Sequence, residues 1–197
     1  MKKSKKIVVI GGGASGLVAG IIAGRNGADV LILEHKEKVG KKILATGNGR
    51  CNFTNEYMTE SCFRSENKER VGTVLNKFGT QETLCFFETL GILPKNKNGY
   101  YYPKSNQAAA ILDVLNMELK RQRVEIICNS HVTKITKAKQ FKIVSSTGIY
   151  MADSVILATG GKAAASLGSD GSGYSLVKEF CHTIAPVVPA LVQLHGN

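Results

Sequence analysis

The chain has 197 residues, of which 43% are hydrophobic and 21% are charged, so it is long enough for one large domain or two small ones with a real core. No apolar run approaches the roughly 20 residues needed to cross a bilayer, and the lysine-rich start leads directly into a strand, so we expect neither a membrane span nor a signal peptide. The net charge of +11 admits a polyanionic partner. Because the basic residues are scattered and no recognition module accompanies them, we expect no specific nucleic-acid binding.

The cysteines and histidines give no sign of a disulfide framework or a metal centre. The five cysteines are an odd number and form no C-x-x-C pair. The four histidines are isolated, and no two have the spacing of metal ligands. These patterns favour a reducing compartment, so we expect a cytoplasmic protein without a bound metal. The cysteines are Cys51, Cys62, Cys85, Cys128 and Cys181.

The first thirty-four residues carry a nucleotide-binding pattern. A β-branched run, Lys6–Ile10, leads into Gly11, Gly13 and Gly16 in a G-x-G-x-x-G motif at the start of a small-residue helix. The first glycine permits a tight turn, the second permits close approach of a pyrophosphate, and the third permits close packing of helix on strand. The helix start offers free N–H groups to the phosphates.

An acidic residue completes the pattern. Glu34 follows a second apolar run, Asp29–Leu33, where its carboxylate can accept hydrogen bonds from ribose hydroxyls and would repel a phosphorylated ribose. The site is therefore predicted to bind FAD or NAD in preference to NADP. The alternative is a plain turn between a strand and a helix, which this context disfavours.

The segment from residue 39 to residue 55 is rich in glycine and asparagine and has no clear periodicity. Long irregular loops inside compact domains are usually functional or disordered. Because this segment mixes permissive glycines with hydrogen-bonding side chains and apolar anchors, we interpret it as an ordered loop that cradles a ligand.

The middle of the chain is predicted to hold two helices and a hairpin. Helical spacing of apolar residues predicts helices over Lys68–Phe78 and Gln81–Leu90, with Thr80 as the N-cap of the second. Turn residues within Ile92–Pro103 predict a small hairpin or loop. The tyrosines of Tyr100–Tyr102 face a ligand or cover a helix, and the sequence does not separate these alternatives.

The last third of the chain is predicted to return to the sheet. We expect Ser105 or Asn106 to cap a helix that runs to Arg121. The apolar positions expected to be buried in it are Ala109, Leu112, Leu115, Met117 and Leu119. A strand over 124–127, an antiparallel meander over 131–151 and a central parallel strand over 155–158 follow, and the last strand ends in Thr159-Gly160-Gly161.

Three segments together resemble one family of bacterial flavoproteins. They are the glycine motif with Glu34, the run from Gly40 to Asn55, and Ala158-Thr159-Gly160-Gly161 after the meander. The T-G-x-G-R-C-N-x-T-N run over 46–55 is the most specific, and 168–174 and 189–192 also match in kind. The chain resembles the N-terminal part of NAD(P)/FAD-dependent oxidoreductases of the BaiN-like or aminoacetone-oxidase-like type. The resemblance implies an α/β fold: a Rossmann-like FAD-binding domain of the glutathione-reductase type, with a parallel sheet and a small antiparallel β-meander.

The resemblance also implies a domain organisation. Residues 1–190 are expected to form the N-terminal portion of the FAD-binding domain, with its meander at 131–151, and residues 191–197 to begin a second, substrate-side domain. Two positions depart from the family pattern, because Ser172 stands where the family usually has Asp, and Cys181 where it usually has Gly.

Site residues follow from the resemblance, residue by residue. Those expected to bind the cofactor lie near its pyrophosphate, its adenosine or its flavin. For the pyrophosphate they are Gly11, Gly13, Ala14, Ser15 and Gly16. For the adenosine end they are Glu34 with its neighbour His35, the backbone of Val132, and Ala158, Thr159, Gly160 and Gly161. Near the flavin they are Lys42, Thr46, Gly49, Arg50, Cys51 and Asn52.

The implied activity is that of an FAD-dependent oxidoreductase, which passes hydride or electrons between a small organic substrate or reduced nicotinamide and an acceptor. Lys42 and Arg50 are candidates to stabilise an anionic reduced flavin, and Asn52 is a candidate to hydrogen-bond a ring edge. For Cys51 we favour a packing or ring-contact role over a covalent redox role. No acid or base is assigned. The alternatives are an NAD-linked dehydrogenase and a non-catalytic FAD- or nucleotide-binding protein.

Overall fold

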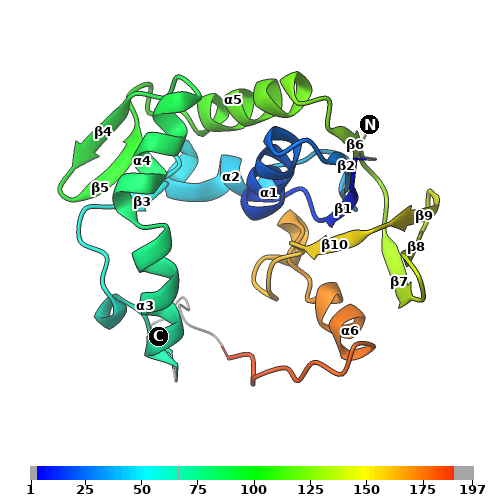
Figure 1. Ribbon diagram of the computed structural model, residues 1–197. Coiled ribbons are helices and arrows are strands. Elements are labelled where there is room, and N and C mark those ends of the chain that lie inside the picture. Colours follow the sequence, from blue (N-terminus) through cyan, green and yellow to red (C-terminus); the bar gives the residue numbers. More distant parts are fainter. Residues whose placement is uncertain (1–3, 66, 189–197) are drawn as a thin grey trace, which may run out of the picture. The chain divides into compact units, whose positions relative to one another are not determined.

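The computed structural model describes residues 4–65 and 67–188 (Figure 1). The predicted matches at 189–192 and the predicted domain start at 191–197 lie outside these residues. The described residues fall into two compact units. Unit 1 contains the residues up to Lys41 and those from Leu119 onward, and unit 2 contains Lys42–Glu118.

Unit 1 is built on a four-stranded sheet of β1 (Lys6–Ile10), β2 (Asp29–Leu33), β6 (Glu125–Ile127) and β10 (Ser154–Leu157). The strand order is β10-β1-β2-β6 and every pair is parallel, which confirms the predicted Rossmann-type fold. Ile10 is in register with both Leu33 and Leu157, so the carboxyl ends of these three strands lie side by side. The predicted parallel strand over 155–158 is confirmed as β10, but its predicted central position is wrong, because β10 is an edge strand of the described sheet and is only half-buried.

Helix α1 (Ala14–Arg25) covers one face of this sheet and lies beside β1 and β2 in Figure 1. Its Leu17 and Ile21 are fully buried. A Cβ on Gly20 would lie 2.9 Å from Cδ1 of Ile32, so a small residue is needed where helix and sheet approach. The small residues expected in this helix therefore allow it to pack closely on β2.

The other face of the sheet packs against an antiparallel meander of β7 (Val132–Lys137), β8 (Phe141–Ser145) and β9 (Gly148–Ala152), as predicted. The short helices η3 (Ala165–Leu167) and α6 (Ser172–Lys178) follow β10. The buried cluster between these elements consists of Val8, Ile10, Leu31, Leu33, Val132, Ile135, Ile143, Ala152 and Leu176. Alternation along β1 and β2 thus supplies both faces of the sheet with apolar side chains.

Unit 2 is mostly helical. Its helices are α2 (Lys41–Ala45), η1 (Thr46–Gly49), η2 (Glu60–Cys62), α3 (Lys68–Lys77), α4 (Thr80–Thr89) and α5 (Ala108–Arg121), the first and last of which extend into unit 1. A small antiparallel sheet has the order β3 (Thr54–Asn55), β5 (Tyr100–Pro103) and β4 (Pro94–Lys97). The two predicted helices and the hairpin are confirmed.

Several local predictions in unit 2 are corrected. Residues 39–55 are not one irregular loop, because α2, η1 and β3 occupy most of it. The N-cap of α4 is Gly79, whose N–H donates to the Glu82 carboxylate at 2.8 Å, while the Thr80 hydroxyl donates to the carbonyl of Asn55. Helix α5 begins at Ala108, beyond both predicted caps.

The predicted buried face of α5 is also partly wrong. Ala109 is exposed and Met117 is 70% exposed, whereas Ala108, Ile111, Leu115 and Leu119 are buried. These buried residues are three or four positions apart, so they lie on one face of the helix. The predicted set contained Leu115 and Leu119 but missed Ala108 and Ile111.

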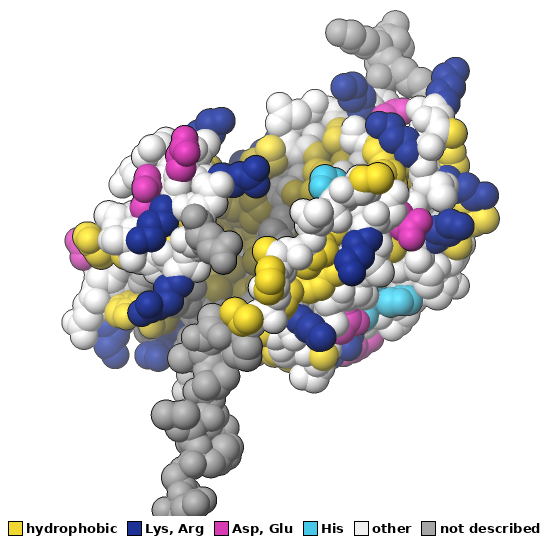
Figure 2. All heavy atoms as spheres, turned by 90° about the horizontal axis from the view of Figure 1, so that it is seen from below, with side chains coloured by type: hydrophobic (Ala, Val, Ile, Leu, Met, Phe, Trp, Pro, Cys, Tyr) yellow, Lys and Arg dark blue, Asp and Glu magenta, His cyan; other side chains and the backbone are white. Residues whose placement is uncertain are grey.

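Across residues 4–65 and 67–188, no helix is long and apolar enough to cross a membrane. Within the same ranges no three His, Cys, Asp or Glu side chains are grouped to hold a metal ion. All five cysteines are free thiols. On the face shown in Figure 2, lysines and arginines are spread among other side chains rather than gathered in one stripe.

Candidate functional site

The three motif glycines of the turn after β1 differ in what surrounds them. Gly11 has φ +105°, and a Cβ there would collide with the carbonyl oxygen of Ala158. A Cβ on Gly16 would collide with the carbonyl oxygen of Gly11, so only glycine lets the helix approach the strand end. At Gly13 the added Cβ would meet nothing within 4 Å. Two of the predicted glycines are therefore needed by the fold, and the third faces open space.

The open space lies at the start of α1. Gly13 is the N-cap and brings no side chain to cap the helix, and Leu17 N donates to its carbonyl at 2.9 Å. The N–H groups of Ala14, Ser15 and Gly16 consequently precede the first intrahelical bond. Ala14 and Ser15 are exposed. An anion placed here would meet free donors and the positive end of the helix dipole.

Glu34 is fixed beside this turn. Its carboxylate is buried, and Oε2 accepts a hydrogen bond of 2.6 Å from Gly12 N while Oε1 accepts one of 2.7 Å from Lys36 N. A Cβ on Gly12 would lie 3.1 Å from Oε2 of Glu34 and 2.5 Å from Cγ1 of Val39. Oε2 has a second lone pair, which leaves capacity for a further donor.

The segment after β10 lies against the same turn. Ala158 N donates to the carbonyl of Ile10 at 2.8 Å, and Thr159 is half-buried. Gly160 has φ +76°, and a Cβ on it would lie 2.6 Å from Oγ of Ser169. Gly171 N donates to the carbonyl of Gly161 at 3.0 Å. The segment 158–161 is thus packed between the glycine turn and the loop over 168–171.

The resemblance predicts that Val132 offers only its backbone to the cofactor. Its side chain belongs to the buried cluster under the meander. The register of β7 and β8 shifts between Val132 and Lys134, which marks an irregularity in the ladder. Such bulges leave backbone groups unpaired and re-aim the strand, which agrees with an expectation that rests on main-chain groups.

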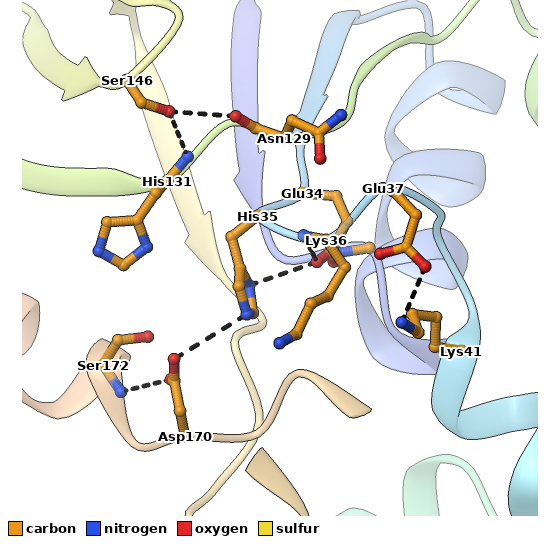
Figure 3. A network of polar contacts seen from close by, with 11 residues as sticks. Glu34, His35, Lys36, Glu37, Lys41, Asn129, His131, Ser146, Asp170 and Ser172 are labelled. Atoms are coloured by element: carbon orange, nitrogen blue, oxygen red, sulfur yellow. Dashed lines mark hydrogen bonds and ion pairs between the residues drawn. The ribbon is translucent and has the colours of Figure 1, made fainter. Parts of the chain in front are cut away.

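His35 and Asp170 extend the network of Glu34 (Figure 3). His35 Nδ1 lies 3.3 Å from Glu34 Oε1, and His35 Nε2 lies 3.9 Å from Asp170 Oδ2. The sequence reasoning gave Asp170 and Gly12 no role. Ser172 brings no carboxylate, but Asp170 lies two residues earlier, and the D-G-x-G pattern over 170–173 could have indicated it.

In unit 2, the predicted flavin loop closes on itself. Thr46 Oγ1 donates to the carbonyl of Ile43 at 2.7 Å, and Cys51 N donates to the carbonyl of Thr46 at 3.1 Å. Four residues have positive φ: Gly47 (56°), Asn48 (55°), Gly49 (78°) and Cys51 (59°). Left-handed residues in such a turn direct successive N–H groups to one side, a geometry that suits anionic or polar ligands.

The cations of this loop are placed by local contacts. The Arg50 guanidinium lies 5.1 Å from the centre of the Tyr102 ring, and its Nε donates to the carbonyl of Gly47 at 3.0 Å. A cation held on an aromatic ring loses little freedom on meeting an anion. Lys42 is half-buried on α2.

Cys51 and Asn52 are held by the loop itself. Cys51 is buried, and burial raises the pKa of its thiol, an effect that a hydrogen bond with Thr46 partly offsets. Asn52 Nδ2 donates to the carbonyls of Thr54 at 2.8 Å and Tyr101 at 3.0 Å. These bonds use both amide hydrogens, so only Oδ1 of Asn52 can meet a ligand.

The structure brings the predicted residues together in two groups. Unit 1 gathers Gly11 to Gly16, Glu34, His35, Val132 and Ala158 to Gly161 around the carboxyl ends of β1, β2 and β10. Unit 2 contains Lys42 on α2 and, in the segment that follows this helix, Thr46, Gly49, Arg50, Cys51 and Asn52.

Comparison with known proteins identifies a family and several relatives of this chain. The family described as HI0933-like protein Rossmann domain matches residues 5–193. The 3-dehydro-bile acid delta(4,6)-reductase of Clostridium scindens is 55% identical over 192 residues, covering 96% of this chain and 47% of the relative. The ribosomal RNA dihydrouridine synthase of Escherichia coli is 28% identical over 186 residues, covering 94% of this chain and 46% of the relative. The chain therefore spans about half the length of the curated relatives it matches.

Solved structures support the fold. A flavocytochrome c3 fumarate reductase in its open conformation superimposes with a TM-score of 0.61 at 19% identity, covering 90% of this chain and 40% of the other. The 3-ketosteroid-delta4-(5alpha)-dehydrogenase of Rhodococcus jostii RHA1 gives a TM-score of 0.58 at 16% identity, covering 81% of this chain and 46% of the other.

Proposed function

Because the chain belongs to the HI0933-like family of Rossmann domains, we propose that it binds FAD and serves an FAD-dependent oxidoreductase that acts on a small organic substrate. The observation that carries the proposal is the open start of α1 above Gly13, with the fixed Glu34 carboxylate beside the same turn. A diphosphate fits the free N–H groups, and a ribose diol fits the carboxylate.

Different residues of unit 1 contact different parts of the dinucleotide. The N–H groups of Ala14, Ser15 and Gly16 bind the pyrophosphate, and Glu34 accepts from the adenosine ribose. The backbone of Val132 meets adenine, and Ala158 to Gly161 lie along the adenosine end. The buried carboxylate disfavours a phosphorylated ribose, since two anions would then share one poorly solvated site.

The loop of unit 2 is proposed to serve the flavin end. Bound FAD supplies hydride transfer at its isoalloxazine ring. Arg50 and Lys42 offer positive charge to an anionic ring, and Asn52 offers its Oδ1 to a ring N–H. Cys51 packs at the ring rather than reacting, because burial raises its pKa and keeps the thiol protonated.

The substrate class is proposed from the relative in Clostridium scindens, whose name describes reduction of a 3-dehydro-bile acid. We propose reduction of a carbon–carbon double bond conjugated to a ketone. This consumes one hydride and one proton, with reduced nicotinamide as the source of the hydride. Ribosomal RNA is the less favoured substrate, because its modifying relatives are only 28% and 26% identical.

The domain and compartment are part of the same proposal. Residues 1–190 are proposed as the N-terminal portion of the FAD-binding domain, with the residues from 191 opening the substrate side. The five free thiols suit a reducing cytoplasm.

Purified protein with excess FAD, reduced nicotinamide and a conjugated 3-oxo steroid acid tests this function. We expect bound flavin absorbance and substrate-dependent oxidation of nicotinamide by the full-length protein. Bound NAD with no flavin would favour an NAD-linked dehydrogenase. Bound FAD with no turnover on the steroid or on ribosomal RNA would favour a nucleotide-binding role without catalysis.

A further inference from the structure

We propose that His35 is a positioning residue which, when protonated, joins Glu34 to Asp170 and holds the two sides of the adenosine site together. The inference rests on the proposed function, because it concerns the affinity of unit 1 for FAD. It assigns His35 a proton-dependent role rather than a direct contact with the cofactor.

His35 lies between two carboxylates (Figure 3). Its Nδ1 is 3.3 Å from Oε1 of Glu34, and its Nε2 is 3.9 Å from Oδ2 of Asp170. Nε2 is buried, and within the described part of the chain no hydrogen-bond partner reaches it. A neutral imidazole has one N–H, so a bond from Nδ1 to Glu34 leaves a lone pair facing Asp170. The imidazolium has a proton for each carboxylate.

The two carboxylates belong to different sides of the site. Glu34 ends β2 and binds the glycine turn through Gly12. Asp170 Oδ1 accepts from Ser172 N at 2.9 Å, and its loop packs on the segment after β10 through Gly171 N and the carbonyl of Gly161. The imidazolium therefore connects the group that binds the ribose to the loop that supports residues 158–161.

A negatively charged carboxylate faces His35 from the loop ahead of α6. Hydrogen bonds from Ser172, followed by the charge of His35, hold the pKa of Asp170 below its ordinary value, so Asp170 is a carboxylate. The Glu34 charge contributes to raising the pKa of the nearby Cys128 thiol, after burial, which keeps that thiol neutral.

Two further groups face the site. Lys36 follows His35 in the chain and flanks Gly168, and the His131 ring meets His35 edge to face, with centroids 6.1 Å apart. Lys36 carries the same sign of charge as the imidazolium, whereas Asp170 carries the opposite sign. We therefore expect FAD affinity to be highest in slightly acidic solution and to fall as the pH rises.

Equilibrium titration with FAD from about pH 5.5 to about pH 8.5 tests the inference on the full chain. The wild type should lose affinity by about fivefold to tenfold over this range, a size typical of coupling between two sites. His35→Gln should bind weakly at every pH, whereas His35→Lys should retain affinity at high pH because its charge persists. His131→Gln is the matched control and should keep the wild-type slope.

The outcomes separate this inference from the proposed function. FAD binding that is independent of pH, or a wild-type slope retained by His35→Gln, overturns the role of His35 while leaving FAD binding intact. Transfer of the pH dependence to His131 also overturns it. Failure of a folded wild-type chain to bind FAD at any pH overturns both.

Discussion

At the scale of single residues, the three motif glycines serve two different purposes. Gly11 and Gly16 are required by the backbone, since a Cβ at either position collides with a carbonyl oxygen. Gly13 has φ −77° and ψ −176°, which any residue adopts, and open space around it. The fold alone therefore gives no reason for glycine at this position.

This difference predicts that valine at the two positions destabilises the chain to very different extents. Gly16→Val should destabilise the chain severely, because overpacking against backbone cannot be relieved by a rotamer change. Gly13→Val should lower the free energy of unfolding by less than about 1 kcal/mol, because the side chain has room and only the preference of a helix N-cap for glycine over valine is lost. Urea unfolding followed by circular dichroism measures both. Equal destabilisation by the two variants would contradict the distinction.

Glu34 has a structural as well as a binding role. Glu34→Ala leaves Gly12 N and Lys36 N without their acceptor, which should cost about 1 to 3 kcal/mol of stability even without ligand. Glu34→Gln retains one acceptor oxygen and should lose less. Thermal unfolding of the ligand-free chain checks the order, and an alanine variant as stable as the wild type would show that these bonds contribute nothing.

Cys51 should react slowly with alkylating agents. Burial raises the pKa of its thiol, so the reactive thiolate should form only at a pH above that of an unstructured cysteine peptide. Alkylation rates against pH, followed by mass spectrometry, give the profile, with the exposed Cys62 as the control for access. A fast reaction of Cys51 at neutral pH would instead support the covalent redox role.

At the scale of elements, the sequence predicted whether a segment is a helix or a strand better than it predicted where that element begins and ends. Continuous apolar runs identified β1 and β2, and helical spacing identified α3 and α4. The N-cap of α4 was missed because Gly79 carries no capping side chain and is stabilised by Glu82 from within the helix. The edge position of β10 was missed because strand order depends on pairings far apart in the sequence.

The sequence predicts a function for the loop after α2 but does not predict its conformation. Its geometry depends on left-handed residues such as Asn48 and Cys51, whose conformations no periodicity reveals. The side-chain amide of Asn52 attaches it to β3 and β5 through carbonyls in both strands, and Phe53 N donates to the carbonyl of Tyr101 as well. Such pairings are visible only once the hairpin is formed.

Asn52→Ala should therefore loosen this loop without disturbing unit 1. Loss of two part-buried hydrogen bonds should lower the stability of unit 2 by about 1 to 3 kcal/mol. Hydrogen exchange of the amides over 46–55 measures the effect, and Asn76→Ala, on the exposed side of α3, is the matched control. Unchanged protection in the Asn52 variant would show that the loop is held elsewhere.

At the scale of the whole molecule, the dinucleotide site proposed for unit 1 draws on segments spread along the chain. The glycine turn, Glu34 and Ala158 to Gly161 meet because three parallel strands end at one edge of the sheet. The family match over residues 5–193 agrees with this arrangement. The glycine motif predicts Gly11, Gly13 and Gly16 as site residues, whereas the hydrogen bond from Gly12 N to Glu34 is seen only in the structure.

Titration of the purified chain with FAD, followed by flavin fluorescence, examines the assembled site as a whole. We expect saturable binding by the wild type and its loss in a Gly13→Val variant that retains the wild-type circular dichroism spectrum. A folded wild-type chain that leaves FAD free in solution, or a Gly13→Val chain that binds FAD equally well, would contradict the account.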